Sequence, residues 1–127
     1  MTRASGPSEV EQVKETSRGL RGHLAESTVD GAPAFDEDGY TLLKFHGIYQ
    51  GYDRDSATEL KQSGQEKHYQ LMVRARIPGG RLTAVQYLAF DALAGRHANG
   101  TLRLTTRQSI QLHGVLKRDI KDKIGRA

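Results

Sequence analysis

The chain has 127 residues, of which 36% are hydrophobic, and a formal net charge of +4 at pH 7, which favours anionic partners such as nucleic acid, oxyanions or polycarboxylate cofactors. It contains no cysteine, which excludes disulfides, a thiolate nucleophile and any cluster or haem held by cysteine from this chain. No window reaches the roughly 18 consecutive apolar residues of a membrane span, and the N-terminus lacks the apolar segment of a secretory signal, so we expect a cytoplasmic protein without membrane contact.

Residues 1–66 have few regularly spaced apolar positions. A short, weakly amphipathic helix through Val10 and Val13 is interrupted by two glycines, and residues 30–39 consist of turn residues among acids. The more apolar residues 40–45 are expected to be extended. The pattern predicts an N-terminal arm over 1–66, largely extended or mobile, with little core of its own.

From residue 68 the sequence alternates between apolar and polar side chains, as a half-buried strand does. The residues expected on the apolar side are Leu71, Val73, Ala75 and Ile77. Those expected on the polar side are Gln70, Met72, Arg74 and Arg76. The PGG run that follows ends the strand.

A helix is predicted to follow this strand. Thr83 is suited to the N-cap and Gln86 to the third helical position, which together make a capping box. The helix should run to about His97, and the pair Asn99-Gly100 supplies a left-handed stop. The apolar residues spaced for one face of this helix are Val85, Leu88, Ala89, Ala92 and Leu93.

Residues 101–114, TLRLTTRQSIQLHG, alternate again and are expected to form one long strand, with a bulge near residues 106–109 as the alternative. The polar side of that strand would carry Arg103, Thr105, Arg107, Ser109, Gln111 and His113. A second helix begins near Leu116 and is truncated at the chain end. The order predicts an α+β fold: an incomplete ferredoxin-like (split β-α-β) half-domain over residues 67–127, preceded by the extended arm.

The polar side of the two strands would place several guanidinium groups on one sheet face, with no Asp or Glu among them. Guanidinium forks onto carboxylates and oxyanions, so this face suits a polyanionic ligand. A plain solvated face is the competing interpretation. Nucleic acid is disfavoured because the polar side lacks the aromatic side chains on which RNA bases stack. The five histidines lack paired metal-ligand spacing, so no metal site is expected in this chain.

The motifs MVRARIPGGRLT and NGTLRLTTRQSIQLHG resemble the first ferredoxin-like half-domain of the sirohaem nitrite and sulfite reductases. SRGLRGHLAE and LLKFHGIYQGYDRD are similar to the arm of the sulfite reductases, which usually carries Gln or Asp in place of Gly51-Tyr52. The resemblance covers most of residues 12–120. It implies an assimilatory sulfite reductase, in which sirohaem bridged to a [4Fe-4S] cluster reduces sulfite to sulfide by six electrons. The cluster cysteines of the family lie beyond position 127, so we expect an N-terminal fragment that is inactive alone.

The resemblance also implies roles for individual residues. Arg74 would be catalytic, on the substrate side of the sirohaem, and Arg107, Gln111 and His113 would bind the cofactor. Strand parity adds Arg103 and Thr105 to the cofactor set. The implied partners are sulfite or nitrite, the remaining domains of the reductase, and an electron donor that is a flavoprotein or a ferredoxin. The alternatives are an assimilatory nitrite reductase and a cofactor-free ferredoxin-like binding module.

Overall fold

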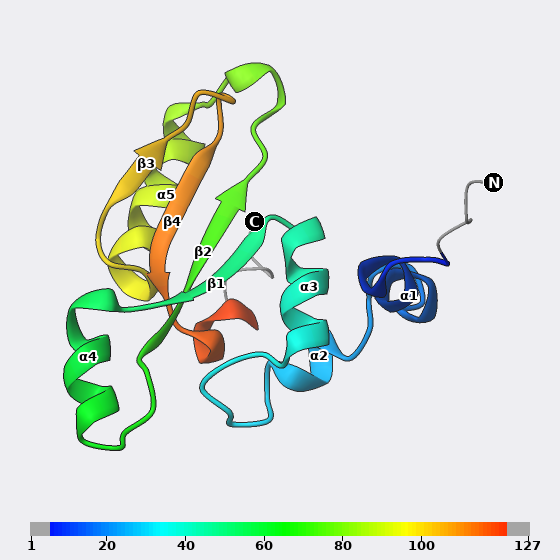
Figure 1. Ribbon diagram of the computed structural model, residues 1–127. Coiled ribbons are helices and arrows are strands. Elements are labelled where there is room, and N and C mark those ends of the chain that lie inside the picture. The colour runs from blue at the N-terminus through cyan, green and yellow to red at the C-terminus, as the bar shows by residue number, and fades with distance from the viewer. Residues whose placement is uncertain (1–5, 122–127) are drawn as a thin grey trace.

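The computed structural model describes residues 6–121 and has an antiparallel sheet of four strands flanked by helices (Figure 1). The strands are β1 (Ile48–Tyr52), β2 (Tyr69–Ala75), β3 (Leu102–Leu104) and β4 (Ile110–Val115). They lie in the order β1-β2-β4-β3, so that β2 and β4 are central. The predicted α+β class is therefore confirmed.

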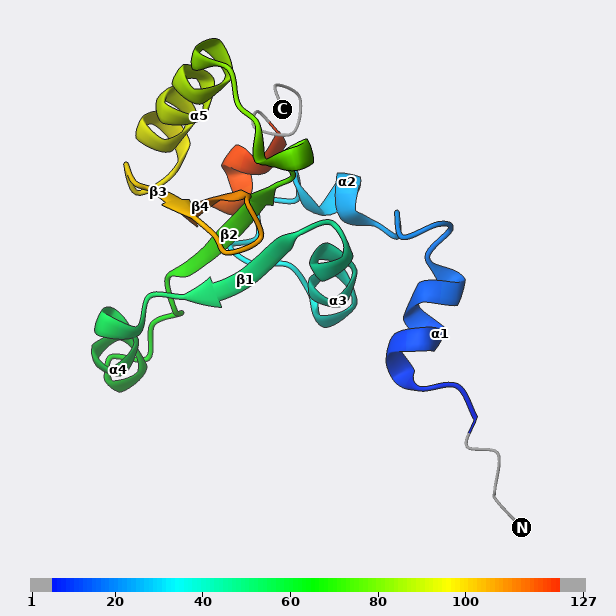
Figure 2. The ribbon, with the colours of Figure 1, turned by 90° about the horizontal axis from the view of Figure 1, so that it is seen from above.

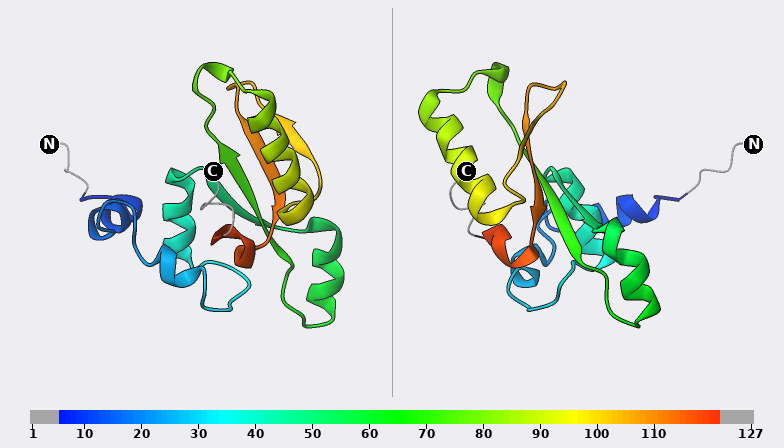
Figure 3. Two further views of the ribbon diagram at one scale, coloured as in Figure 1. Left: turned by 180° about the vertical axis from the view of Figure 1, so that it is seen from behind. Right: turned by 90° about the vertical axis from the view of Figure 1, so that its left-hand side faces the viewer.

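Five α-helices and two short 3-10 helices accompany the sheet within the described residues. They are α1 (Glu9–Thr16), α2 (Leu24–Ser27), α3 (Glu37–Phe45), α4 (Arg54–Gln62), α5 (Ala84–His97), η1 (Pro78–Gly80) and η2 (Lys117–Asp119). Helix α5 covers one face of the sheet, and α3 lies beside the edge strand β1 (Figure 2). In the view from behind, α5 lies in front of β4, and it does not cover the opposite face of the sheet (Figure 3). None of the described helices is long and apolar enough to cross a membrane.

The core combines residues from both halves of the chain. Its buried members are Phe35, Leu43, Ile48, Leu71, Ala94, Leu112, Val115 and Ile120. The expectation that residues 1–66 are largely extended is wrong for the described part of this segment, which contains α1 to α4 and β1 and adds Phe35, Leu43 and Ile48 to the shared core. Strand β1 pairs with β2 over five residues, and the side chains of α3 and β1 complete the apolar layer that β2 and β4 begin.

The prediction of an extended segment over residues 40–45 is also wrong, because these residues belong to helix α3. Asp36 caps the helix by accepting a hydrogen bond of 2.8 Å from the backbone N–H of Gly39. Two acidic residues follow in the first turn, where the helix dipole favours negative charge. The adjacent Leu42 and Leu43 are both buried, a pattern that a helix packed on two sides accommodates.

Residues 101–114 form a hairpin rather than the single strand that was predicted. Strands β3 and β4 pair antiparallel, with Leu104 opposite Ile110. In the turn between them, Gln108 has a φ of 55° and its backbone N–H donates to the carbonyl oxygen of Thr105 over 3.0 Å. The Thr105 hydroxyl contacts the Ser109 hydroxyl at 2.7 Å, which closes the turn. Such side-chain hydrogen bonds let Thr and Ser end a strand where simple alternation would continue it.

Helix α5 begins and ends where the sequence predicts. The Thr83 and Gln86 capping box is present, the helix ends at His97, and Gly100 takes a φ of 83°. Its predicted apolar face is wrong, because Val85 and Leu88 are 77% and 62% exposed. The side chains of α5 that reach the core are Leu93 and Ala94. The second predicted helix, from residue 116, is described only as η2 and the two residues after it, and the rest lies outside the described residues.

A buried lysine links two segments that lie far apart in the sequence. Lys117, in η2, donates from its Nζ to Asp30 Oδ1 over 2.6 Å and to the carbonyl oxygen of Ala34 over 3.0 Å. Its Nζ also lies 4.8 Å from the centre of the Phe35 ring. The hydrogen bond from Lys117 is the main cause that lowers the pKa of Asp30, so the carboxylate form is favoured. This ion pair fixes the loop before α3 against the segment after β4.

Candidate anion-binding face

Three polar residues stand side by side on the sheet face opposite α5. In the register of the sheet, Arg74 on β2 lies opposite Gln111 on β4, and Gln111 lies opposite Arg103 on β3. Residues paired in this way across an antiparallel sheet point to the same face, about 5 Å apart. The neighbouring pair Val73 and Leu112 points to the other face, toward the core. Within the described residues, the sheet therefore carries a continuous polar row over β2, β4 and β3, which we call the arginine row.

Arg74 has a partly buried side chain with one unsatisfied hydrogen-bond donor. Its backbone N–H donates to the carbonyl oxygen of Gly47 over 2.8 Å, which extends the pairing of β1 with β2. Its side-chain Nε is buried and has no hydrogen-bond partner among the described residues. The guanidinium carbon lies 5.9 Å from the centre of the Tyr49 ring. A buried donor without an acceptor is costly, and an anionic ligand would satisfy it.

His113 continues the polar face along β4. Its Nε2 lies 3.1 Å from the side-chain oxygen of Gln111. Burial lowers the pKa of His113, and the positive charge of Arg103 lowers it further. The neutral ring is therefore favoured, and a ligand that brings negative charge would raise the proton affinity of the ring.

A hollow of about 340 Å³ opens on the same face. Its lining includes Tyr49 of β1, Met72 of β2, and both Arg103 and His113 of the β3–β4 hairpin. A register shift between β2 and β4 occurs beside it, where Gly114 has a φ of 73°. A side chain at position 114 would come within 3.0 Å of Asn99, so glycine permits this close approach. Of the arginine row, Arg103 lines this hollow, whereas Arg74 and Gln111 do not.

The structure does not bring every expected site residue into this row. Thr105 and Arg107 follow β3 in the hairpin turn, and the Thr105 hydroxyl is engaged by Ser109. Arg76 is exposed beyond the end of β2. Conversely, sequence reasoning missed Tyr49, because residues 48–52 were not assigned to a strand. Alternation along IYQGY would have placed Tyr49 on the sheet face away from the buried Ile48.

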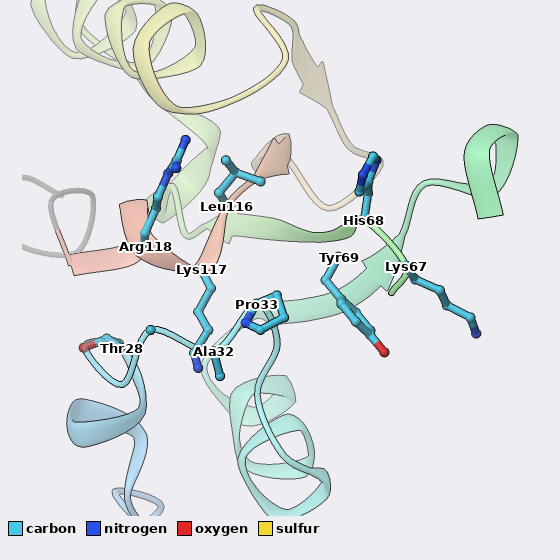
Figure 4. Close-up of a pocket in the computed structure, with 10 residues that line it drawn as sticks. Thr28, Ala32, Pro33, Lys67, His68, Tyr69, Leu116, Lys117 and Arg118 are labelled. Atoms are coloured by element: carbon cyan, nitrogen blue, oxygen red, sulfur yellow. The ribbon is translucent and has the colours of Figure 1, made fainter. Parts of the chain in front are cut away.

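A second hollow of about 350 Å³ lies between the loop at residues 28–33, the start of β2 and η2. Its basic side chains do not converge: Lys67 points away from the others, and Arg118 points away from the loop (Figure 4). Lys117 points toward the loop, where it is held by Asp30. Within residues 6–121 there is also no group of three or more His, Asp or Glu side chains that could hold a metal ion. The arginine row is therefore the better candidate site.

The fold and this face define a ferredoxin-like α+β domain with a basic, donor-rich sheet surface. Residues 63–124 match the nitrite/sulfite reductase ferredoxin-like half domain. The chain is also similar to proteins named sulfite reductase [NADPH] hemoprotein beta-component: 50% identical over 113 residues in Xanthomonas oryzae, 52% over 116 in Geobacillus kaustophilus and 50% over 124 in Shouchella clausii. These matches cover 88%, 91% and 97% of this chain, but only 20%, 20% and 22% of the relatives.

The chain therefore belongs to the nitrite/sulfite reductase family, as the resemblance of its motifs implied. It spans about one fifth of the length of the curated relatives that it matches.

Proposed function

We propose that this chain is part of a sulfite reductase hemoprotein and supplies basic residues that bind sirohaem and the sulfite oxyanion. The observation that carries the proposal is the arginine row, with the buried and unpartnered Nε of Arg74 at its β2 end. A solvated sheet face would leave its polar atoms hydrated. A buried guanidinium nitrogen instead favours a site that is completed by an anion.

The donor set suits a group with several carboxylates. Guanidinium groups bind carboxylates through two parallel hydrogen bonds, and the side chains of Gln111 and His113 add further polar contacts on the same face. We assign sirohaem binding to Arg103, Gln111 and His113, and also to Arg107 at the exposed hairpin turn. Thr105 remains a weaker member of this set, because Ser109 already engages its hydroxyl. The chain has no cysteine, so the ligands of an iron–sulfur cluster would come from other parts of the enzyme.

When bound, the sirohaem and its iron–sulfur partner would supply the electrons that reduce sulfite to sulfide. The role of Arg74 is to bind the oxyanion and to offset the charge that develops as S–O bonds break. The neutral ring of His113 can accept a proton when negative charge enters the face. Sulfite is preferred over nitrite as the substrate because the matched relatives are sulfite reductases, and their names favour an NADPH-linked electron donor over a ferredoxin.

The test is Arg74→Ala in the hemoprotein that contains this sequence. Loss of one preorganised donor should lower kcat for sulfite reduction by about 100- to 1000-fold. Arg74→Lys should recover only part of the activity, because lysine keeps the charge and loses the forked geometry. Arg76→Ala is the matched control, since Arg76 is exposed beyond β2. Steady-state sulfite reduction is measured with sirohaem absorbance, and parental turnover by Arg74→Ala with a full sirohaem content would refute the assignment.

A further inference from the structure

Tyr49 is the aromatic side chain that stands beside Arg74. It comes from β1, which precedes the segment that matches the half-domain family. Tyr49 pairs with Met72, so it is a diagonal neighbour of Arg74 on the same face of the sheet. Its ring centre is 5.9 Å from the Arg74 guanidinium carbon, and 36% of the residue is exposed.

The backbone immediately before β1 lies close to Arg74. Gly47 has a φ of 76°, and a side chain there would lie 3.3 Å from the backbone oxygen of Arg74 and 3.7 Å from its Cβ. Glycine at this position therefore allows the positive φ and the close approach to the backbone oxygen of Arg74. The side chain of β1 that contacts the Arg74 guanidinium is Tyr49.

We propose that Tyr49 is a positioning residue, which holds the Arg74 guanidinium in the orientation that presents its donors to an oxyanion. This inference rests on the proposed role of Arg74 in oxyanion binding. An aromatic ring attracts the guanidinium through its face without accepting its N–H groups in conventional hydrogen bonds. A carboxylate at the same place would occupy those donors and neutralise the charge. A ring therefore restricts the long side chain while its donors stay available, which reduces the entropy lost on binding.

The expected effect is smaller than that of removing Arg74. Loss of one cation–π contact corresponds to roughly 2- to 30-fold in affinity. Tyr49→Leu should therefore weaken sulfite binding by about that factor, whereas Tyr49→Phe, which keeps the ring, should bind like the parent. Tyr49→Thr is a second variant suited to a strand, should the leucine variant fail to fold. Tyr52→Leu on the same strand is the matched control, because Tyr52 contacts Lys67 instead.

The experiment titrates inorganic sulfite into the 127-residue chain and follows the Nε–H resonance of Arg74 by NMR, with thermal midpoints recorded for every variant. The same variants are compared in the hemoprotein by KM and kcat for sulfite. We expect a saturable shift of this resonance in the parent, in Tyr49→Phe and in Tyr52→Leu. Tyr49→Leu and Tyr49→Thr should bind sulfite more weakly. In the hemoprotein, adding Tyr49→Leu to Arg74→Ala should cause no further loss of activity.

Two failures are distinguishable. If the parent shows no saturable shift, or if Arg74→Ala leaves sulfite reduction unchanged, oxyanion binding by Arg74 is wrong and the inference falls with it. If Arg74→Ala loses activity while folded Tyr49→Leu and Tyr49→Thr bind and reduce sulfite like the parent, Arg74 keeps its role and Tyr49 does not position it. An additive loss in the double variant would likewise overturn the positioning role.

Discussion

Replacing Leu43 by alanine tests whether helix α3 belongs to the core. Leu43 is 3% exposed and packs in the main apolar cluster, although its segment was predicted to be an extended arm. Deleting a buried leucine side chain down to alanine removes about three carbon groups, at about 0.8 kcal/mol each for the transfer from water alone. The cavity left behind adds to this, so we expect Leu43→Ala to destabilise the chain by about 2–5 kcal/mol.

Leu88→Ala is the matched control, because it makes the same chemical change at a position 62% exposed. The predicted apolar face of α5 includes Leu88, whereas the structure leaves it in solvent. Its replacement should change stability by no more than about 0.5 kcal/mol. Urea unfolding of the parent chain and both variants, followed by circular dichroism, gives the midpoints and slopes. If Leu88→Ala destabilised the chain as much as Leu43→Ala, the placement of α3 and α5 in this fold would be refuted.

Two further predictions concern charged groups. Asp30→Asn should lower the urea midpoint more than Lys117→Met, because the first leaves a buried ammonium without its carboxylate and the second frees a carboxylate whose side chain is 43% exposed; the reverse order would contradict the role of the ion pair. The pKa of His113 is lowered in the folded state, so the unfolded state binds the proton more readily. The contribution of neutral His113 to folding stability is therefore present above the ordinary His pKa and is lost as pH falls through the folded-state pKa. His113→Gln should remove that loss, and unfolding measured across pH 7 to 5 would show no difference from the parent if burial did not disfavour the charged ring.

The parts of the fold that could be predicted from the sequence are those encoded locally. The capping box at Thr83 and Gln86 and the left-handed Gly100 fixed both ends of α5, since each depends on residues only a few positions apart. The alternation through Leu71 and Val73 gave β2 its faces for the same reason, and the placement of Arg74 on the polar face followed from it.

Most of the wrong predictions concern features that a tertiary contact determines. Val85 and Leu88 have helical spacing, but spacing alone does not reveal that the sheet is met near the C-terminal end of α5, at Leu93 and Ala94. The error over α3 has a local cause instead: the run around Leu42 and Leu43 suits a strand or a helix, and the overlooked N-cap by Asp36 selects the helix. In the candidate site, the contact between Tyr49 and Arg74 depends on the pairing of β1 with β2, which no local pattern specifies.

The pairing of β1 with β2 makes the folding unit longer than the segment that matches the half-domain family. The family match begins at residue 63, yet β1 ends at Tyr52 and supplies the strand next to β2. A segment cut at the family boundary would expose one hydrogen-bonding edge of β2 and remove Leu43 and Ile48 from above Leu71. We therefore expect such a segment to be a poor choice for expression, because it lacks the preceding strand and helix that complete the core.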